Sequence, residues 1–155
     1  FGYLYNHPLH WIDYRKGLAE ELASQGHTVL VDYTATWCAT CKTNKALAIE
    51  VDSTVQLVNA LKVVVILADY SKADPDIEQE LKQYGRPSVP MCLVYAADKP
   101  QSPELLPTLL TPSVVQDALQ RAGPSRVDAS SLPGSPGDQS ADAPASAASR
   151  QDPAS

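Results

Sequence analysis

Two cysteines three positions apart, Cys38 and Cys41, directly follow an apolar run of β-branched and aromatic residues that begins at Val31. The pattern predicts a strand that leads into a helix at Cys38, so the unpaired N–H groups of the first helical turn point at its sulfur. That environment favours the thiolate, the reactive form of cysteine. Cys41 lies one turn further on, close enough to close a small disulfide ring. The sequence therefore predicts a dithiol that opens and closes.

Two less reactive interpretations of this pair remain open. A structural zinc site needs two more Cys or His ligands, and the remaining candidates form no second pair at zinc spacing. These candidates are Cys92, His7, His10 and His27. A purely structural disulfide would close a very short loop and would stabilise the protein little. Redox chemistry is favoured because the Cys-x-x-Cys follows a strand in an α/β pattern.

Length and charge limit the classes of protein to consider. The 155 residues predict one domain with extensions. The net charge of −6 and the pI of ≈ 4.9 argue against nucleic acid as the main partner. No apolar run approaches the ~20 residues that span a bilayer, and no signal peptide is visible. Because the chain begins abruptly at Phe1, we expect it to be a piece of a longer precursor.

The periodicity of the chain predicts alternating helices and strands between a linker and a tail. Residues 1–10 are expected to be a linker or juxtamembrane segment, 11–122 the domain, and 123–155 a disordered tail rich in Ala, Ser and Pro. Helices are expected over 11–22, 38–49, 53–61, 75–84 and 112–122, and strands over 28–34, 62–68 and 89–95. The segment 101–107 reads as an irregular edge. Ser53, Asp74 and Thr111 are expected to cap helices.

This order of elements, with Trp-Cys-x-x-Cys-Lys and a later Val-Pro, resembles the thioredoxin superfamily. The segments 31–45, 68–70, 74–77, 84–90 and 106–112 are most similar to the C-terminal thioredoxin-like domain of DsbD-type transmembrane disulfide reductases. The resemblance spans roughly residues 11–122. It implies an α/β thioredoxin fold, with a central mixed β-sheet flanked by helices and followed by the disordered tail.

The resemblance also implies roles for individual residues. Cys38 matches the nucleophile and Cys41 the resolving thiol. Asp32 matches the buried acid that manages the proton of the second cysteine, and its pKa should be raised by desolvation. Pro90 matches the cis-proline beside the disulfide, and Val89 precedes it. The alternatives are a charge tolerated at a strand edge for Asp32 and an ordinary trans proline for Pro90.

Three further residues are less certain. Trp37 is expected to form an apolar wall beside the dithiol, although an aromatic there could equally be core. Lys45 stands where many DsbD-type relatives have an acid; it either points toward Cys38 and favours the thiolate or is a solvated helix charge. Cys92 is expected to be a small core side chain, which an oxidising compartment would require of a spare thiol.

The implied activity is thiol–disulfide exchange by a protein-disulfide reductase, with no metal or organic cofactor beyond the redox-active disulfide itself. Expected partners are other thiol or disulfide proteins, bound transiently as mixed disulfides, and a transmembrane electron donor domain; the domain itself is expected to be monomeric. The expected location is the periplasmic side of an inner membrane, with a link to cytochrome c-type biogenesis. Alternatives are a free-standing secreted oxidase or isomerase and a non-catalytic peptide-binding module that uses the groove at Val89 and Pro90.

Overall fold

The structure, a computed structural model, describes residues 8–128 of the chain. Its centre is a five-stranded mixed sheet in the order β1-β3-β2-β4-β5. The strands are β1 (Trp11–Asp13), β2 (Val29–Thr34), β3 (Val64–Asp69), β4 (Met91–Tyr95) and β5 (Glu104–Leu105). The first three lie parallel to one another, whereas β4 pairs antiparallel with both β2 and β5. The central position of β2 matters for function because the cysteine pair follows it.

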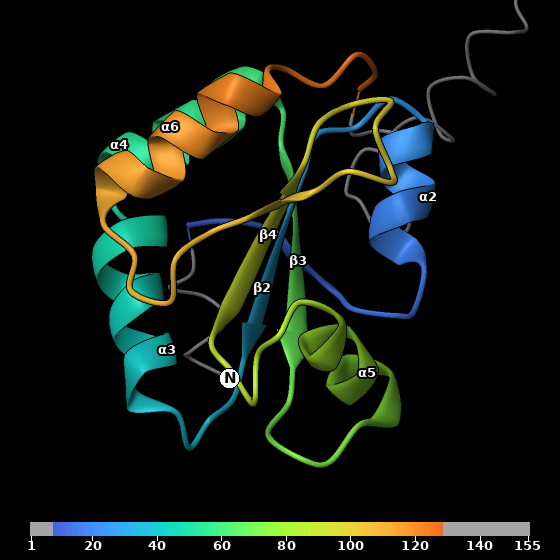
Figure 1. The fold of residues 1–155 in the computed structure, drawn as a ribbon. Helices are drawn as coiled ribbons and strands as arrows, with labels where there is room; N and C mark the ends of the chain where they lie inside the picture. Colours follow the sequence, from blue (N-terminus) through green and yellow to red (C-terminus); the bar gives the residue numbers. More distant parts are fainter. Residues whose placement is uncertain (1–7, 129–155) are drawn as a thin grey trace, which may run out of the picture.

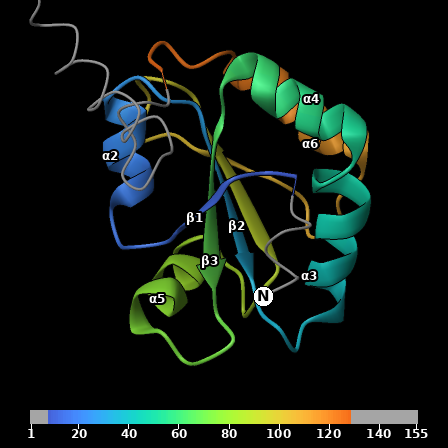
Figure 2. The same ribbon diagram turned by 180° about the vertical axis from the view of Figure 1, so that it is seen from behind.

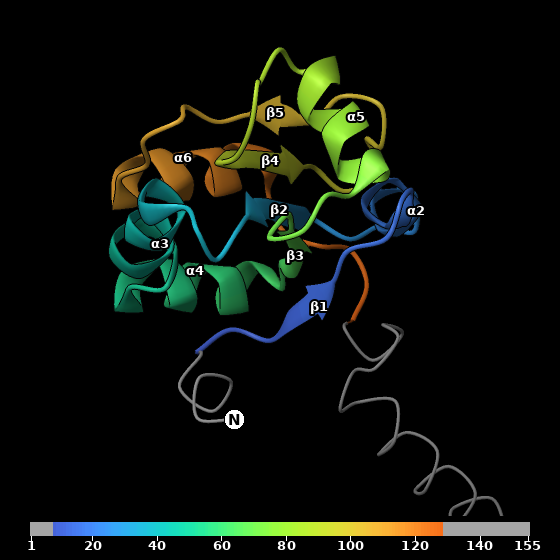
Figure 3. The ribbon, with the colours of Figure 1, turned by 90° about the horizontal axis from the view of Figure 1, so that it is seen from below.

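Helices cover both faces of this sheet. On one face lie α2 (Leu18–Ser24) and α5 (Pro75–Gln83); on the other lie α3 (Ala39–Asn44), α4 (Asp52–Leu61) and α6 (Pro112–Ala122) (Figure 1). The view from below shows these two helical layers with the strands between them (Figure 3). The expected α/β fold with a central mixed sheet is thus confirmed.

Two hydrophobic clusters divide the core along the sheet. Side chains alternate between the faces of a strand, so Val29, Val31 and Tyr33 of β2 pack with α2 and α5, while Leu30 packs with α4 and α6. Asp32 shares the face of Leu30 by the same alternation. A carboxylate therefore points into the layer that contains the helix of the cysteine pair.

The first predicted helix, over 11–22, is wrong in its first half. Residues Trp11–Asp13 form β1, which pairs with the edge of β3, and the helix begins only at Leu18. Between them, Gly17 has a φ of 85°, a conformation that interrupts a helix and that glycine adopts at little cost. Figure 2 shows β1 lying beside β3 at the edge of the sheet. A short strand followed by a helix thus gave the same apolar spacing as one continuous helix.

Most of the expected helix starts are confirmed, with one exception. The carboxylate of Asp74 and the hydroxyl of Thr111 cap α5 and α6, each followed by proline. Ser53 is not a cap: α4 begins at Asp52, and the Ser53 hydroxyl accepts a hydrogen bond from Gln116 of α6 at 2.8 Å. The Ser53 hydroxyl thus bonds to a residue of another helix, Gln116, rather than to an amide of its own helix as a capping box would require.

The folded domain extends beyond both ends predicted for it. At the start, Leu9 is buried in the cluster under α6, although 1–10 was expected to be a linker. At the end, the expected tail from Gly123 onward is anchored through residue 128. The Ser125 amide donates to the Leu61 carbonyl at 2.8 Å, and the Arg126 amide donates to the Gly26 carbonyl at 2.7 Å. Residues 1–7 and 129–155 lie outside the described part of the chain.

Candidate active site

The cysteine pair lies at the junction between β2 and α3. Cys38 is the N-cap of that helix, with extended backbone angles, and its sulfur accepts a hydrogen bond from the Cys41 amide at 3.1 Å. The two sulfurs are joined in a disulfide. Both cysteines are buried, Cys38 at 7% exposure and Cys41 more deeply at 1%. The expected strand-to-helix junction is confirmed.

The loop before Cys38 is fixed to the loop that follows β3. The Thr36 amide donates to the Ser71 hydroxyl at 2.8 Å, and the Ser71 amide donates to Asp69 at 2.9 Å. Trp37 is 58% exposed, with its indole N–H 3.3 Å from the Ser71 carbonyl. The alternative of a core tryptophan is therefore wrong, and Trp37 stands open to solvent next to Cys38. Ser71 was missed, although Asp69 followed two residues later by serine is a recognisable Asx turn.

Pro90 is preceded by a cis peptide bond, as the resemblance implied. Arg86, from the turn after α5, donates to the Pro90 carbonyl at 3.1 Å and to the Leu106 carbonyl at 2.8 Å. Val89 is buried to 9% exposure, while Pro90 is half-buried. One guanidinium thus ties the cis-proline loop to the segment after β5. No sequence pattern indicated this contact, since it joins positions that are close only in the folded chain.

Asp32 is buried beneath the helix that carries Cys41. It retains 3% of its surface and pairs in register with Cys92 of β4. The pKa of its carboxyl is raised from 3.8 to about 6 in all: desolvation raises it most, the nearby Lys45 ammonium lowers it, and the Glu50 carboxylate raises it. The expectation of a buried acid with a raised pKa is confirmed, and the alternative of a tolerated strand-edge charge is wrong.

Lys45 is not the solvated helix charge that one alternative expected. It is 8% exposed, and its ammonium lies 3.4 Å from the Asp32 carboxylate in an ion pair. The same ammonium lies 4.5 Å from the centre of the Trp11 ring. The solvated alternative is wrong because the π-helical turn Lys45–Ile49, which continues α3, turns this side chain toward the sheet. Its charge acts on Asp32.

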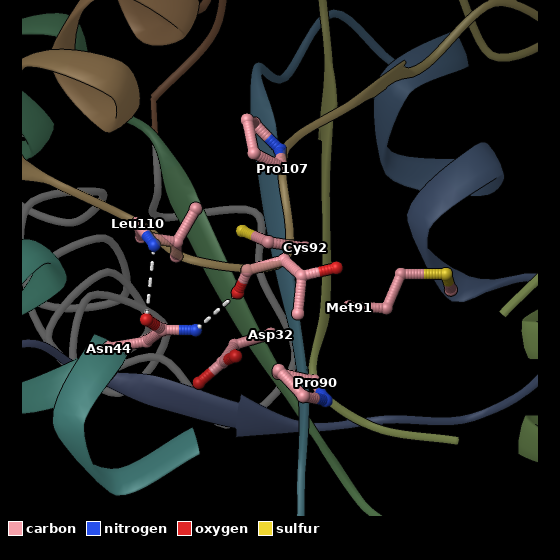
Figure 4. Close-up of a pocket in the computed structure, with 8 residues that line it drawn as sticks. Asp32, Asn44, Pro90, Met91, Cys92, Pro107 and Leu110 are labelled. Carbon is pink, nitrogen blue, oxygen red and sulfur yellow. Dashed lines mark hydrogen bonds between the residues drawn. The ribbon is translucent and has the colours of Figure 1, made fainter. Parts of the chain in front are cut away.

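Asp32 lines a small pocket, and Asn44 connects α3 to the segment that forms one side of it. The Asn44 amide donates to the Thr108 carbonyl at 2.9 Å and accepts from the Leu110 amide at 3.1 Å. Figure 4 shows Asp32, Pro90 and Cys92 on the other walls. Asn44 is 4% exposed and was also missed by sequence reasoning, because its partners lie more than 60 residues away.

Cys92 is an unreactive core thiol. It is 3% exposed, and burial, together with the charge of Asp32, raises its pKa well above the usual range. The expectation of a small core side chain is confirmed. Within residues 8–128, no group of three or more His, Cys, Asp or Glu side chains is arranged to hold a metal ion. No helix in that part of the chain is both long and apolar enough to cross a membrane.

Comparison with known proteins agrees with this geometry. A model of a family described as thioredoxin-like matches residues 10–97, more than half of the 155 residues. The chain belongs to the thioredoxin-like family. With the Cys38–Cys41 disulfide at the start of α3, this thioredoxin-like protein is a thiol–disulfide oxidoreductase that exchanges disulfides with transient partners. No curated protein sequence gave a significant match.

Solved structures show the same fold. The C-terminal domain of DsbD from Neisseria meningitidis in its oxidised form is 21% identical, with a TM-score of 0.53, covering 67% of this chain and 89% of that one. The reduced form of the same domain is 24% identical, with a TM-score of 0.51, covering 66% and 90%. A thioredoxin from Thermus thermophilus is 18% identical, with a TM-score of 0.51, covering 74% and 85%. The thioredoxin-like domain is therefore similar to both DsbD and free-standing thioredoxins in fold.

Proposed function

We propose that this chain is a protein-disulfide reductase that takes electrons from a membrane-embedded donor domain and passes them to other exported thiol proteins. The observation that carries the proposal is the Cys38–Cys41 disulfide at the start of α3, next to exposed Trp37, with Cys41 more deeply buried than Cys38, at 1% against 7% exposure. A nucleophile that is less enclosed than its resolving thiol is suited to repeated disulfide transfer. The membrane-linked version of this role rests on the resemblance of the segments around the cysteine pair to DsbD-type domains, whose fold this chain shares.

The proposed reaction runs in two exchanges. The Cys38 thiolate attacks one sulfur of a partner disulfide, and the other partner sulfur leaves as a thiolate that takes up a proton. Cys41 then loses its proton to Asp32 and attacks the Cys38 sulfur, which releases the second partner thiol. Two electrons have passed to the partner, and Cys38 and Cys41 are joined as in the structure. The disulfide carries the electrons, so the reaction uses no other cofactor.

Partner recognition in this proposal uses the surface around Cys38. Trp37 lies exposed on one side, and the cis-proline loop, held by Arg86, borders the pocket on the other. A partner disulfide would be presented between them. In the full-length protein the domain would face the periplasm, tethered to the inner membrane and close to its donor.

The test is reduction of insulin by the reduced protein. Cys38→Ser should abolish reduction, because the attacking sulfur is gone. Cys41→Ser should accumulate mixed disulfides that dithiothreitol releases, because attack survives while resolution is lost. Cys92→Ser is the matched control, and it should retain activity because Cys92 is a buried core thiol. Full activity in the Cys38→Ser protein would overturn the assignment.

The direction of electron flow needs its own measurement. Equilibration of the Cys38–Cys41 pair against glutathione gives its reduction potential. A reductase is expected near the value of about −270 mV found for thioredoxin, and an oxidant near the value of about −120 mV found for DsbA. A potential near the DsbA value would favour the secreted-oxidase alternative. Transfer of electrons to this domain from a membrane fraction containing the full-length protein would then test the proposed donor.

A further inference from the structure

Leu109 is the most exposed large hydrophobic side chain in the part of the chain that the structure describes, at 70%. It lies between β5 and α6 in the segment 106–111, and Asn44 of the active-site helix α3 bonds to the residues on both sides of it. We propose that Leu109 determines specificity for protein partners with an apolar side chain beside their disulfide, and that Asn44 is the positioning residue that presents it. This role rests on the proposed function and names the partner chemistry of that site.

The Asn44 carboxamide fixes the backbone before and after Leu109. Its NH₂ group donates to the Thr108 carbonyl at 2.9 Å, and its oxygen accepts from the Leu110 amide at 3.1 Å (Figure 4). Asn44 is 4% exposed and lies three positions after Cys41 on the same helix. The peptide groups on either side of Leu109 are therefore attached to the helix that carries the dithiol, while the side chain of Leu109 remains in solvent.

The other end of this segment is attached to the cis-proline loop. Arg86 donates to the Leu106 carbonyl at 2.8 Å and to the Pro90 carbonyl at 3.1 Å. The Leu106 side chain is buried at 1% exposure, and its amide donates to the backbone of β4 at 3.0 Å. Because the segment is held by α3 at one end and by β4 and the cis-proline loop at the other, Leu109 has a set position beside the dithiol.

The elements that hold Leu109 and Trp37 belong to opposite faces of the sheet. The segment 106–111 runs beside α3, whereas Ser71, which accepts the indole N–H of Trp37, precedes α5 on the other face (Figure 1). The same segment lines the pocket beside Pro90. A partner disulfide presented at the end of β2 would thus have Trp37 on the α5 side and Leu109 on the α3 side.

Exposure alone does not distinguish Leu109, because single apolar side chains are common on protein surfaces. Leu47, on the π-helical turn Lys45–Ile49, is 63% exposed. What distinguishes Leu109 is that hydrogen bonds on both sides hold its backbone next to the pocket. An apolar side chain on a backbone that is already fixed loses less conformational entropy when a partner covers it, so its burial contributes more to binding.

The partner that fits this surface is a protein disulfide with a residue such as leucine close to one cysteine. Contact between that side chain and Leu109 would remove apolar surface from water, which favours association. The contact acts on binding rather than on the sulfur atoms that react. It should therefore lower the concentration of partner that half-saturates the reaction and leave the limiting rate unchanged.

Two synthetic peptides with one internal disulfide test this role. They are identical except that the residues next to each cysteine are leucine in one peptide and serine in the other. The rate at which the reduced chain forms its Cys38–Cys41 disulfide is measured against peptide concentration, by acid quenching, alkylation and mass spectrometry. The chains compared are wild type, Leu109→Ser, Asn44→Ala and the double variant. Leu47→Ser is the matched control, because Leu47 is similarly exposed but lies outside the segment 106–111.

The wild-type chain should prefer the leucine peptide through a lower half-saturating concentration, with a similar limiting rate for both peptides. Leu109→Ser should raise that concentration for the leucine peptide about three- to tenfold and should change the value for the serine peptide by less than about twofold. Asn44→Ala should also raise it, because the backbone of Leu109 is no longer held. It should add little in the double variant, since both substitutions act through one contact. Leu47→Ser should behave as wild type.

An unchanged preference in Leu109→Ser, or no preference in wild type, would overturn the role of Leu109. Because Leu109 is exposed, this variant should fold even where Asn44→Ala does not; Asn44→Asp, which has the same shape and loses the donor to Thr108, then replaces Asn44→Ala. Additive effects in the double variant would overturn the role of Asn44. Ellman's reagent, a small disulfide, separates the two proposals. A wild-type chain that reduces neither the peptides nor this reagent would overturn the proposed function, whereas reduction of both peptides without preference would overturn only the role of Leu109.

Discussion

Replacing Asp32 with asparagine should make the oxidised protein more stable at neutral pH. The side chain is buried at 3% exposure, and asparagine is close to a permanently neutral form of the same shape. An ionised carboxylate in this place costs free energy because it has lost its hydration, and the Lys45 ammonium 3.4 Å away returns only part of that cost. The acid is therefore retained at the expense of stability, as expected for a group that serves the reaction.

The size of the effect follows from the pKa. Folding raises the Asp32 pKa from 3.8 to about 6. A group whose pKa is raised on folding stabilises the protein below its unfolded pKa, and this stability is lost as pH rises through the folded value. A shift of about 2 units at ~1.36 kcal/mol each gives a loss of roughly 3 kcal/mol by pH 7. Protonation of Asp32 removes its ion pair with Lys45, as the substitution by asparagine does. The roughly 3 kcal/mol obtained from the pKa shift therefore already includes the loss of that ion pair.

Urea unfolding of the oxidised protein at pH 7 and pH 4 measures this difference. Asp32→Asn should be more stable than wild type by roughly 3 kcal/mol at pH 7 and by less than about 1 kcal/mol at pH 4, where Asp32 is protonated in the folded state. Asp13→Asn, at an exposed position of β1, is the control and should change stability by at most about 0.5 kcal/mol at either pH. A variant that is less stable than wild type at pH 7, or a gain of equal size at both pH values, would refute the reasoning.

Two further predictions concern contacts that hold the domain and its active-site loop. A chain ending at Ala122 should have a free energy of unfolding about 1–3 kcal/mol lower than one ending at Asp128, because the hydrogen bonds of Ser125 to both neighbouring segments are lost. Its urea midpoint should therefore be lower, and equal midpoints would show that this segment adds no stability. Arg86→Met should raise the KM for insulin several-fold with a smaller change toward Ellman's reagent, because the Pro90 carbonyl loses its donor and the loop that borders the partner surface is released. Equal losses toward both substrates would point to damage of the dithiol itself.

Local patterns in the sequence were enough to predict the reacting groups. A strand that runs into Cys-x-x-Cys places Cys38 at a helix start, whereas the cis bond before Pro90 was implied by the family resemblance. The helix starts at Asp74 and Thr111 were equally predictable, because a cap acts on amides two or three residues away. The burial of Asp32 was likewise implied by the resemblance, which matched it to the buried acid of the superfamily. Each of these features depends on neighbours within a few positions or on a short repeat.

Only the tertiary structure decided what surrounds the reacting groups. From the sequence, Lys45 could be either solvated or directed toward the site. Which of these holds depends on the element that packs against its side of the helix. Trp11 was assigned to a helix because its apolar spacing fits either structure, and pairing with β3 made it a strand. The bonds of Arg86 and of the segment at Ser125 reach carbonyls that are distant in sequence. The dithiol is encoded by spacing along the chain, whereas the charge that acts on its buried acid comes from long-range packing, which short-range patterns do not specify.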